Sequence, residues 1–230
     1  MSATSFEPAR YTPSDAAVVP RLHVLTDTRD GRDPLPCVAG ALQAAHTVGA
    51  SIAVQVRHKS ATDRELFQLT RRVVAMVAET GPPRCWVVVD DRVDVALAAG
   101  AHGVHLGAHD LPVDVARHLA ADRLRVGGTA RDPAGARVLV DSGVAYLGVG
   151  PCFETRTKRG LPAPLGVQRL GEVARAASVP VVAIGGVDAG RAAALVRAGA
   201  HGVAVVSAVS EAADPQAATA RLLEAVAVCP

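Results

Sequence analysis

Aromatic residues make up only 3% of this 230-residue chain, and it has no long hydrophobic run. So few aromatic rings suit poorly the stacking of single-stranded nucleic acid, and no block of Lys and Arg stands out to bind phosphate backbones. No apolar stretch approaches the roughly 18 residues that a membrane-spanning helix needs. The first residues show no basic segment followed by an apolar run, so no signal peptide is expected. We therefore expect neither nucleic acid nor a membrane as a partner.

Cysteine is also scarce, and its positions lack the spacing of a metal site. Cys37, Cys85, Cys152 and Cys229 form no Cys-x-x-Cys pair and no Cys/His cluster of the zinc type. Scattered thiols fit a reducing compartment, which predicts a cytoplasmic protein. Half of the residues are hydrophobic, 20% are charged and the net charge is +2, which excludes a wholly disordered chain. The oligomeric state stays open, and a homo-oligomer is compatible with the sequence.

Short runs rich in Val and Ile alternate along the chain with Ala/Leu/Arg stretches of helical period. The expected strands are Leu22–Thr26, Ile52–Val56, Trp86–Asp90, Gly103–Leu106, Arg125–Gly127, Tyr146–Val149, Val181–Ile184 and Gly202–Val206. The expected helices include Asp63–Glu79, Asp132–Ser142, Val167–Ala176, Ala189–Ala198 and Pro215–Val228. The strands are apolar on both faces, as buried parallel strands are.

Eight strand–helix units in 230 residues give about 29 residues per unit, the size of a unit in a small barrel. Gly-Ala-His-Gly-Val occurs twice, at Gly100–Val104 and Gly199–Val203, each time between an expected helix and an expected strand. The sequence predicts a single-domain (β/α)8 TIM barrel over residues 21–230, after a flexible extension over 1–20. A doubly wound open sheet is the competing fold, but no Gly-x-Gly-x-x-Gly follows the first strand.

Polar residues gather where the expected strands end, which is the rim that carries the active site in such barrels. Arg57, Lys59 and Lys158 come from two distant loops and could converge on one anion. Carboxylates at Asp90, Asp91 and Asp110 are ligands that Mg²⁺ prefers. Backbone N–H groups at Gly185–Gly186 and Val206–Ser207 follow strands seven and eight, where barrels commonly bind phosphate. Together they suggest a phosphorylated substrate and a metal-assisted diphosphate leaving group.

Each of these features also has a purely structural interpretation. Asp91 could cap the helix that follows it. Arg57 and Lys59 could belong to a solvated loop, which is the usual place of two nearby charges. His105 could line the mouth of the barrel or hydrogen-bond beneath a helix, and Trp86 is most simply a core residue.

Taken in order, seven segments resemble the thiamine phosphate synthase superfamily, which also contains thiazole tautomerases. The resemblance runs from Arg21 to the C-terminus and is closer to the synthases. The segments are Leu22–Asp27, Gln55–Lys59, Asp90–Leu97, Gly103–Pro112, Tyr146–Lys158, Ala183–Gly186 and Gly202–Ser207. Singly they are weak signals, and in this order they are specific to the superfamily.

The resemblance implies a transferase of thiamine biosynthesis. It would join 4-amino-2-methyl-5-pyrimidinylmethyl diphosphate to 4-methyl-5-(2-phosphoethyl)thiazole, or its carboxylate, and release diphosphate. By position, Asp91 and Asp110 would bind Mg²⁺. Arg57, Lys59, Lys158 and Thr129 would be catalytic and hold the diphosphate. Substrate binding would use these four together with Gln55, Asp90, Thr155, Thr157, Gly186, Val206 and Ser207.

Several residues depart from the superfamily pattern. Asp90 replaces an Asn, Ala108 replaces a Gln, and Thr129-Ala-Arg131 replaces Ser-x-His. In the tautomerase branch that His is thought to move protons, which Arg131 does not do near neutral pH. Phe153–Thr155, however, resembles the tautomerase branch. A thiazole tautomerase and a non-catalytic paralogue that binds a thiamine precursor therefore remain alternatives, and another phosphate-handling barrel, such as a sugar-phosphate isomerase, has support from the fold only.

Overall fold

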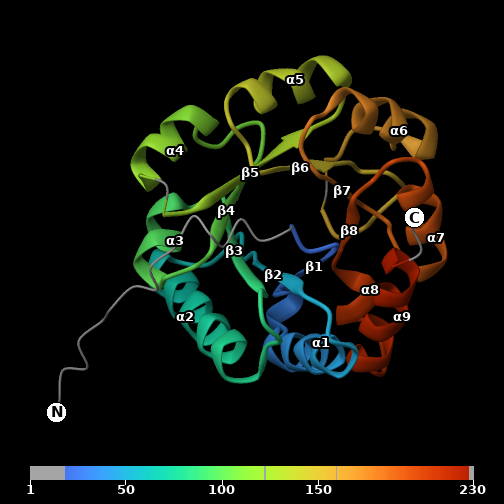
Figure 1. Ribbon diagram of the computed structural model, residues 1–230. Helices are drawn as coiled ribbons and strands as arrows, with labels where there is room; N and C mark the ends of the chain where they lie inside the picture. The colour runs from blue at the N-terminus through green and yellow to red at the C-terminus, as the bar shows by residue number, and fades with distance from the viewer. Residues whose placement is uncertain (1–18, 122, 159, 228–230) are drawn as a thin grey trace, which may run out of the picture.

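Eight parallel strands close into a barrel in the computed structural model, which describes residues 19–121, 123–158 and 160–227. Each strand pairs with the next along the chain, and β1 also pairs with β8. The strands are β1 (Leu22–Leu25), β2 (Ile52–Val56), β3 (Trp86–Asp90), β4 (Gly103–Leu106), β5 (Arg125–Ala130), β6 (Tyr146–Val149), β7 (Val181–Ile184) and β8 (Gly202–Val205). Figure 1 looks along the barrel axis and shows the helices as an outer ring. The predicted (β/α)8 barrel is confirmed.

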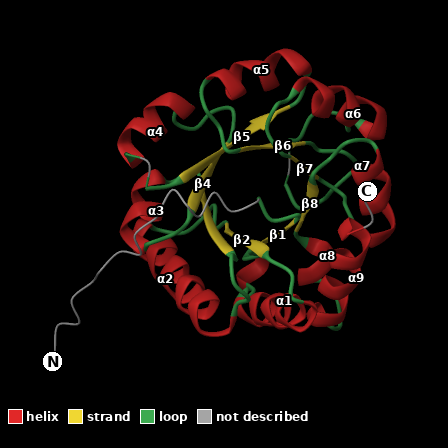
Figure 2. Cartoon of the chain, viewed as in Figure 1, coloured by secondary structure: helices red, strands yellow, loops and turns green. Residues whose placement is uncertain are grey.

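The outer ring alternates with the strands, as Figure 2 shows by colour. Its helices are α1 (Leu35–Val48), α2 (Asp63–Thr80), α3 (Val93–Ala99), α4 (Val113–Ala120), α5 (Pro133–Asp141), α6 (Gly166–Ala176), α7 (Ala189–Arg197), α8 (Ser207–Ser210) and α9 (Pro215–Ala227). A short 3₁₀ turn, Arg29–Gly31, follows β1. The eighth unit contributes two helices, and the first of them, α8, starts directly behind β8.

Local signals fix where the helices begin and end. The Thr62 side chain accepts from the backbone N–H of Glu65, and the Glu65 carboxylate accepts from the backbone N–H of Thr62 at 2.8 Å. This capping box starts α2. Gly100, at φ +73°, ends α3, and Gly199, at φ +113°, follows the end of α7, so both copies of the repeated pentapeptide open with a glycine that reverses the chain.

Two apolar layers hold the barrel together. The larger layer lies between the strands and the helices, as expected for strands that are apolar on both faces. The smaller one fills the inside of the barrel and consists of Val19, Leu25, Ala53, Trp86, Val88, Tyr146, Val182 and Ala204. Trp86 is 1% exposed, which confirms that it is a core residue. The barrel is therefore filled below its rim, where the imidazole of His23 is also buried, and space for a ligand opens at the C-terminal ends of the strands.

The predicted limits of β5 were wrong. The strand runs on to Ala130 instead of ending at Gly127, so Thr129 lies inside the strand rather than behind it. A glycine pair usually interrupts a strand, but here the missing side chain is required, because a Cβ at Gly127 would overlap the ring of Tyr146. β1 and β8 each end one residue earlier than predicted.

Most of the predicted N-terminal extension lies outside the described residues. Val19 and Pro20, the two described residues of that range, are buried. Val19 is 7% exposed, belongs to the inner apolar layer, and its carbonyl oxygen lies 2.6 Å from Nε2 of His201. These two residues are thus part of the packed barrel.

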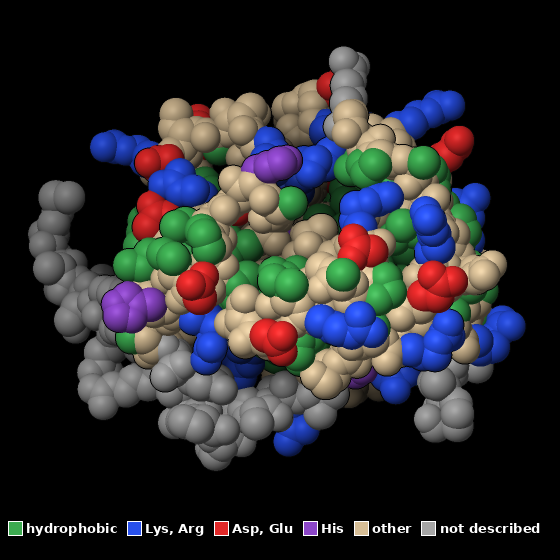
Figure 3. Space-filling view, turned by 90° about the horizontal axis from the view of Figure 1, so that it is seen from above, with side chains coloured by type: hydrophobic (Ala, Val, Ile, Leu, Met, Phe, Trp, Pro, Cys, Tyr) green, Lys and Arg blue, Asp and Glu red, His purple; other side chains and the backbone are tan. Residues whose placement is uncertain are grey.

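The outer surface carries charges of both signs. Figure 3 shows Lys and Arg side chains interspersed with Asp and Glu on the face seen there, without a large area of one sign. Within the described ranges, no helix combines the length and the apolar character needed to cross a membrane.

Candidate active site

A cleft opens at the C-terminal ends of the strands and encloses about 1030 Å³ of empty space, part of it open to solvent. All thirteen residues predicted for the site line it. They are Gln55, Arg57, Lys59, Asp90, Asp91, Asp110, Thr129, Thr155, Thr157, Lys158, Gly186, Val206 and Ser207. They come from loops or strand ends of seven of the eight units, and the closed barrel brings them to one rim.

Two carboxylates, Asp91 and Asp110, form the acidic side of the cleft. Burial raises the pKa of Asp91, against the hydrogen bond from Lys59, while the charge of Asp90 and the contact with Asp110 add to the rise. Asp110 has a lowered pKa, since hydrogen bonds from Asp91 and from the backbone N–H of Gly107 outweigh the effect of its burial. The Gly107 bond measures 2.7 Å. A carboxyl group with a raised pKa beside a second carboxylate marks a position where a cation would be favoured.

The alternative role of Asp91 as a helix cap is wrong. The N-cap of α3 is Arg92, and no side chain caps this helix. Asp91 instead has φ +65°, a left-handed conformation that costs energy for a residue with a side chain. Such strain is typical of functional positions, and here it directs the carboxylate toward the cleft and an ion pair with Lys59.

The donor set fits magnesium. Within the described residues, no group of three or more His, Cys, Asp and Glu side chains is arranged to hold a metal. Mg²⁺ is usually bound through one or two carboxylates, with water and substrate phosphates completing its shell. Asp91 and Asp110 supply this number of hard oxygen ligands, whereas Asp90 faces Gln55 and Arg57.

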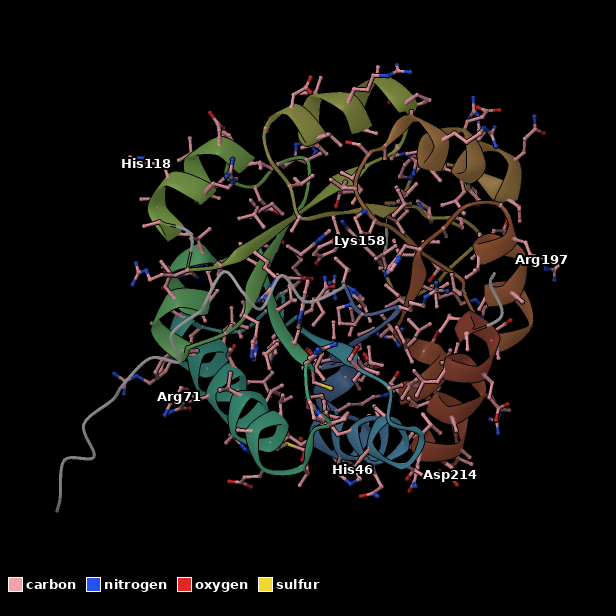
Figure 4. All side chains as sticks on the ribbon, viewed as in Figure 1. His46, Arg71, His118, Lys158, Arg197 and Asp214 are labelled. Carbon is pink, nitrogen blue, oxygen red and sulfur yellow. The ribbon has the colours of Figure 1, made fainter. Side chains whose placement is uncertain are left out.

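Three cations from two loops line the same cleft, and one of them contacts the acidic pair. The backbone of Arg57 is fixed by Thr26, whose hydroxyl accepts from Arg57 N–H at 2.8 Å and donates to Arg57 C=O at 2.9 Å. Lys59 pairs with Asp91. Lys158 is exposed and has no hydrogen-bond or ion-pair partner among the described residues. Figure 4 places Lys158 over the middle of the barrel, while its other labelled side chains lie around the outside.

The floor of the cleft is polar and partly buried. Gln55 donates its amide to Asp90, which is 9% exposed and also lies 3.7 Å from Nε of Arg57. Burial raises the pKa of Asp90 to about 6, although Gln55, Arg57 and Lys59 act in the opposite direction. The ionised form of Asp90, the residue that replaces the superfamily's Asn, therefore lowers the stability of the folded protein.

This predicts a pH-dependent gain from Asp90→Asn. A raised pKa means that the folded protein binds a proton that the unfolded chain has lost, so stability falls as the pH rises from about 4 to about 6 and stays low above. The variant should be more stable by about 2–3 kcal/mol above pH 6 and equal to the wild type near pH 4. Urea unfolding between pH 4 and 8, without metal or ligand, measures the difference.

Asp63→Asn is the matched control. Asp63 is exposed, and its hydrogen bond from Arg92 lowers the pKa, so this variant should lose a little stability at neutral pH and none in acid. A profile for Asp90→Asn that runs parallel to the wild type would contradict the raised pKa.

The opposite side of the cleft is built from backbone. Gly185 and Gly186 have φ of +95° and +65° after β7. A Cβ at Gly186 would lie 2.9 Å from Cβ of Phe153, so this glycine allows the loop after β6 to approach. The N–H of Phe153 donates to Gly185 at 2.9 Å, and the N–H of Thr157 donates to the hydroxyl of Thr155 at 3.3 Å. These contacts bring both threonines and the glycine turn to the cleft.

A buried carboxylate that sequence analysis missed supports the last loop. Asp27, with 2% of its side chain exposed, binds Arg29 and Arg32 at 2.7 and 3.1 Å. It also accepts from the hydroxyl of Ser210 at 2.7 Å. Hydrogen bonds from Arg29 and Ser210 hold the pKa of Asp27 well below its ordinary value. Asp27 thereby ties the loop after β1 to α8, which begins at Ser207 in the cleft.

Arg131 spans the loop after β6, which carries Thr155, Thr157 and Lys158. Its guanidinium donates to the carbonyl of Gly150 at 2.7 Å, where the loop begins, and to Ala163 at 2.9 Å, near its end. A planar fork with several donors can hold two carbonyls at once, which the imidazole expected at this place in the superfamily pattern cannot do in the same way.

Arg131→Ala should therefore loosen this loop. We expect KM for the substrate bound by the loop threonines to rise about tenfold, with a smaller change in kcat. The reason is that each lost hydrogen bond from the guanidinium contributes roughly 1.5–3 kcal/mol to holding the loop in its ordered conformation. Limited proteolysis should cut the variant within residues 150–165 faster than the wild type. Arg137→Ala on α5 is the control, and equal behaviour of both variants would refute the role of Arg131.

Fold and cleft together define a class: a (β/α)8 barrel with paired carboxylates opposite cations at its strand ends. The family model described as thiamine monophosphate synthase matches residues 22–209. A thiamine-phosphate synthase of Salinispora tropica is 50% identical over 207 residues, covering 90% of this chain and 97% of that protein. One from Chloroflexus aurantiacus is 40% identical over 210 residues, covering 90% and 93%.

Solved structures agree. The thiamine phosphate pyrophosphorylase from Pyrococcus furiosus superposes with a TM-score of 0.79 at 34% identity, covering 90% of this chain and 95% of that one. A 3-hexulose-6-phosphate synthase, at 20% identity and a TM-score of 0.65, shares the fold. The chain belongs to the thiamine monophosphate synthase family. The predicted activity, a transferase of thiamine biosynthesis, is thereby confirmed, and the matches favour the synthase over the tautomerase.

Proposed function

We propose that this chain joins 4-amino-2-methyl-5-pyrimidinylmethyl diphosphate to 4-methyl-5-(2-phosphoethyl)thiazole, or its carboxylate, in the strand-end cleft, with Mg²⁺ as cofactor. The observation that carries the proposal is the arrangement of the cleft. A carboxylate pair suited to a cation lies on one side, cations face it, and the backbone turns of Gly186 and Ser207 lie on the other side. The free thiols of Cys37 and Cys85 are compatible with a cytoplasmic location.

The main task of the protein in this reaction would be to stabilise the negative charge that develops on the leaving diphosphate. Bound by Asp91 and Asp110, Mg²⁺ would neutralise charge that develops on the diphosphate. Arg57, Lys59 and Lys158 would bind its oxygens as the bond to the pyrimidine methylene breaks. Lys59 would exchange its pairing with Asp91 for the diphosphate. Because these groups are already in place at the rim, little reorganisation is required when the charge develops.

The nucleophile needs chiefly to be positioned. Thr155, Thr157, the Gly186 backbone and the Val206–Ser207 turn would bind the phosphate of the thiazole. Gln55 and Asp90 would face the pyrimidine. With both rings held, the thiazole nitrogen attacks the methylene carbon that the diphosphate has left, and no side chain has to accept a proton in this step. If the thiazole carries the carboxylate, this group leaves as CO2, so that both thiazole forms give thiamine phosphate.

Arg131 argues against proton transfer to or from the thiazole at this place. Its guanidinium is engaged by the carbonyls of Gly150 and Ala163 and keeps its proton near neutral pH.

A coupled assay tests the proposal. Purified full-length chain, Mg²⁺, the pyrimidine diphosphate and the thiazole phosphate should yield thiamine phosphate and inorganic diphosphate in equal amounts. Chelation should stop the reaction, and added Mg²⁺ should restore it. Absence of product with both thiazole forms, or turnover that is unchanged by chelation, would contradict the proposal.

A further inference from the structure

A row of three hydrogen-bonded side chains crosses the floor of the cleft, and only its last member was predicted as a site residue. The hydroxyl of Tyr146 lies 3.2 Å from Nδ1 of His105. Nε2 of the same imidazole lies 2.9 Å from the hydroxyl of Thr129. His105 and Thr129 line the cleft, whereas Tyr146 lies beneath them and is 1% exposed. The row therefore connects the interior of the barrel with the cleft at the C-terminal ends of the strands.

The barrel is shaped around this row. The rings of His105 and Tyr146 stack with centroids 5.5 Å apart, and the rings of His23 and Tyr146 meet edge-on with centroids 5.1 Å apart. A Cβ at Gly148 would lie 2.8 Å from Cε1 of His105, and one at Gly127 would overlap the Tyr146 ring. Both rings thus have a fixed place and little freedom to turn.

The two rings of the row, Tyr146 and His105, are neutral. Burial, together with the negative charge of Asp90, raises the pKa of Tyr146, so the phenol keeps its proton. Each ring nitrogen of His105 faces an uncharged hydroxyl group, an arrangement that suits a neutral imidazole with a single N–H. A neutral imidazole donates from one nitrogen and accepts at the other, which leaves two arrangements for the row.

The two arrangements differ in which hydroxyl is left without an acceptor. If Nδ1 carries the proton, Thr129 donates to Nε2, and the hydroxyl proton of Tyr146 has no acceptor, because His105 is its only hydrogen-bond partner among the described residues. A fully buried donor without a partner is strongly disfavoured. If Nε2 carries the proton, Tyr146 donates to Nδ1, His105 donates to Thr129, and every buried donor is satisfied.

We propose that Tyr146 holds His105 in its Nε2–H tautomer and that His105 thereby turns the hydroxyl proton of Thr129 toward the cleft. Thr129 then accepts from His105 and has its own proton free for a ligand. Diphosphate oxygens only accept hydrogen bonds, so this direction is the one that the leaving group requires. Tyr146 and His105 are positioning residues, and this role rests on the proposed function in which Thr129 binds the diphosphate.

The tautomer can be read directly by NMR of the full-length chain with ¹⁵N-labelled histidine, with His105→Gln used to assign the signals among the eight histidines. We expect a neutral His105 with its proton on Nε2. Tyr146→Phe, which removes only the hydroxyl, should mix in the Nδ1–H form. A wild-type imidazole that is protonated on Nδ1 would overturn the inference, and this readout does not depend on any enzymatic activity.

Kinetics then tests the link to the reaction. Tyr146→Phe should lower kcat about tenfold and change KM for either substrate by less than about twofold. The Thr129 hydroxyl, which would donate to the charge developing on the diphosphate, is then less well oriented but still present. In a Thr129→Val background the same change should have no further effect. An equal tenfold loss in that background would show that Tyr146 acts through packing and would refute its role in orienting Thr129.

A conservative variant adds a second check. His105→Gln retains an N–H donor that can reach Thr129, whereas His105→Leu has none. Gln should preserve several times more activity than Leu, and equal loss would contradict the inference. If the wild type itself gives no thiamine phosphate, the proposed function fails, while the tautomer measurement still decides the arrangement of the row.

Discussion

Asp91→Asn and Asp110→Asn should each lower kcat/KM for thiamine phosphate formation by about 10³-fold. The two carboxylates line the cleft next to each other, and the described residues include no group of three or more His, Cys, Asp and Glu side chains that could hold a metal ion instead. Losing one of two protein ligands weakens the neutralisation of the leaving diphosphate, and roughly 4 kcal/mol of transition-state stabilisation corresponds to this factor. The apparent Mg²⁺ requirement should rise in parallel, so high Mg²⁺ should restore part of the activity.

Asp114→Asn is the matched control for this prediction. Asp114 is exposed in the first turn of α4, four residues from Asp110, and does not line the cleft. Its substitution should leave both the activity and the Mg²⁺ requirement unchanged. Full activity of Asp110→Asn with an unchanged Mg²⁺ requirement would eliminate the carboxylate pair as the metal site.

Sequence analysis could predict the cleft because the barrel converts order along the chain into position in space. Residues such as Arg57 and Lys158 lie about a hundred positions apart, yet each follows a strand, and all strand ends meet at one rim. The alternation of strands and helices predicted which rim carries the polar residues, and the resemblance to the superfamily selected the members of the site among them.

What escaped prediction depends on contacts across the barrel. The hydroxyl of Tyr146 meets His105 41 positions earlier, and Asp27 meets Ser210 at a separation of 183. Periodicity assigns such residues to strands and loops, but it does not say which residue fills the space that a glycine leaves. Gly127 illustrates this, because in sequence it suggests the end of a strand and in the structure it provides room for the Tyr146 ring.

The polar floor also explains how a departure from the superfamily pattern is accommodated. A carboxylate at position 90 can only accept hydrogen bonds, and it takes the amide of Gln55 and lies near Arg57. These partners offset its burial only in part, as its raised pKa indicates. Asp90 therefore accepts the Gln55 amide and, under the proposed function, would share Arg57 with the diphosphate.

Lys158→Ala is expected to have the second large effect, a fall of about 10²- to 10³-fold in kcat/KM for the pyrimidine diphosphate, as for other groups that stabilise developing charge. Lys158 reaches over the cleft from the loop after β6 and has no ion-pair partner among the described residues, so its charge is available to a ligand. The inhibition constant of inorganic diphosphate should rise by a similar factor, because the same contact is lost.

Two further variants make the test specific for a point charge at this position. Arg156→Ala removes an exposed cation from the same loop. Arg156 lines a second hollow beside the cleft, around Phe153 and Arg191, and does not line the cleft itself, so this variant should leave the inhibition by diphosphate unchanged. Lys158→Arg keeps the charge but replaces a compact ammonium with a planar fork, and it should recover only part of the activity. Loss of diphosphate affinity in Arg156→Ala equal to that in Lys158→Ala would mean that the loop attracts the anion by its overall charge, and the assignment of Lys158 to the diphosphate would be wrong.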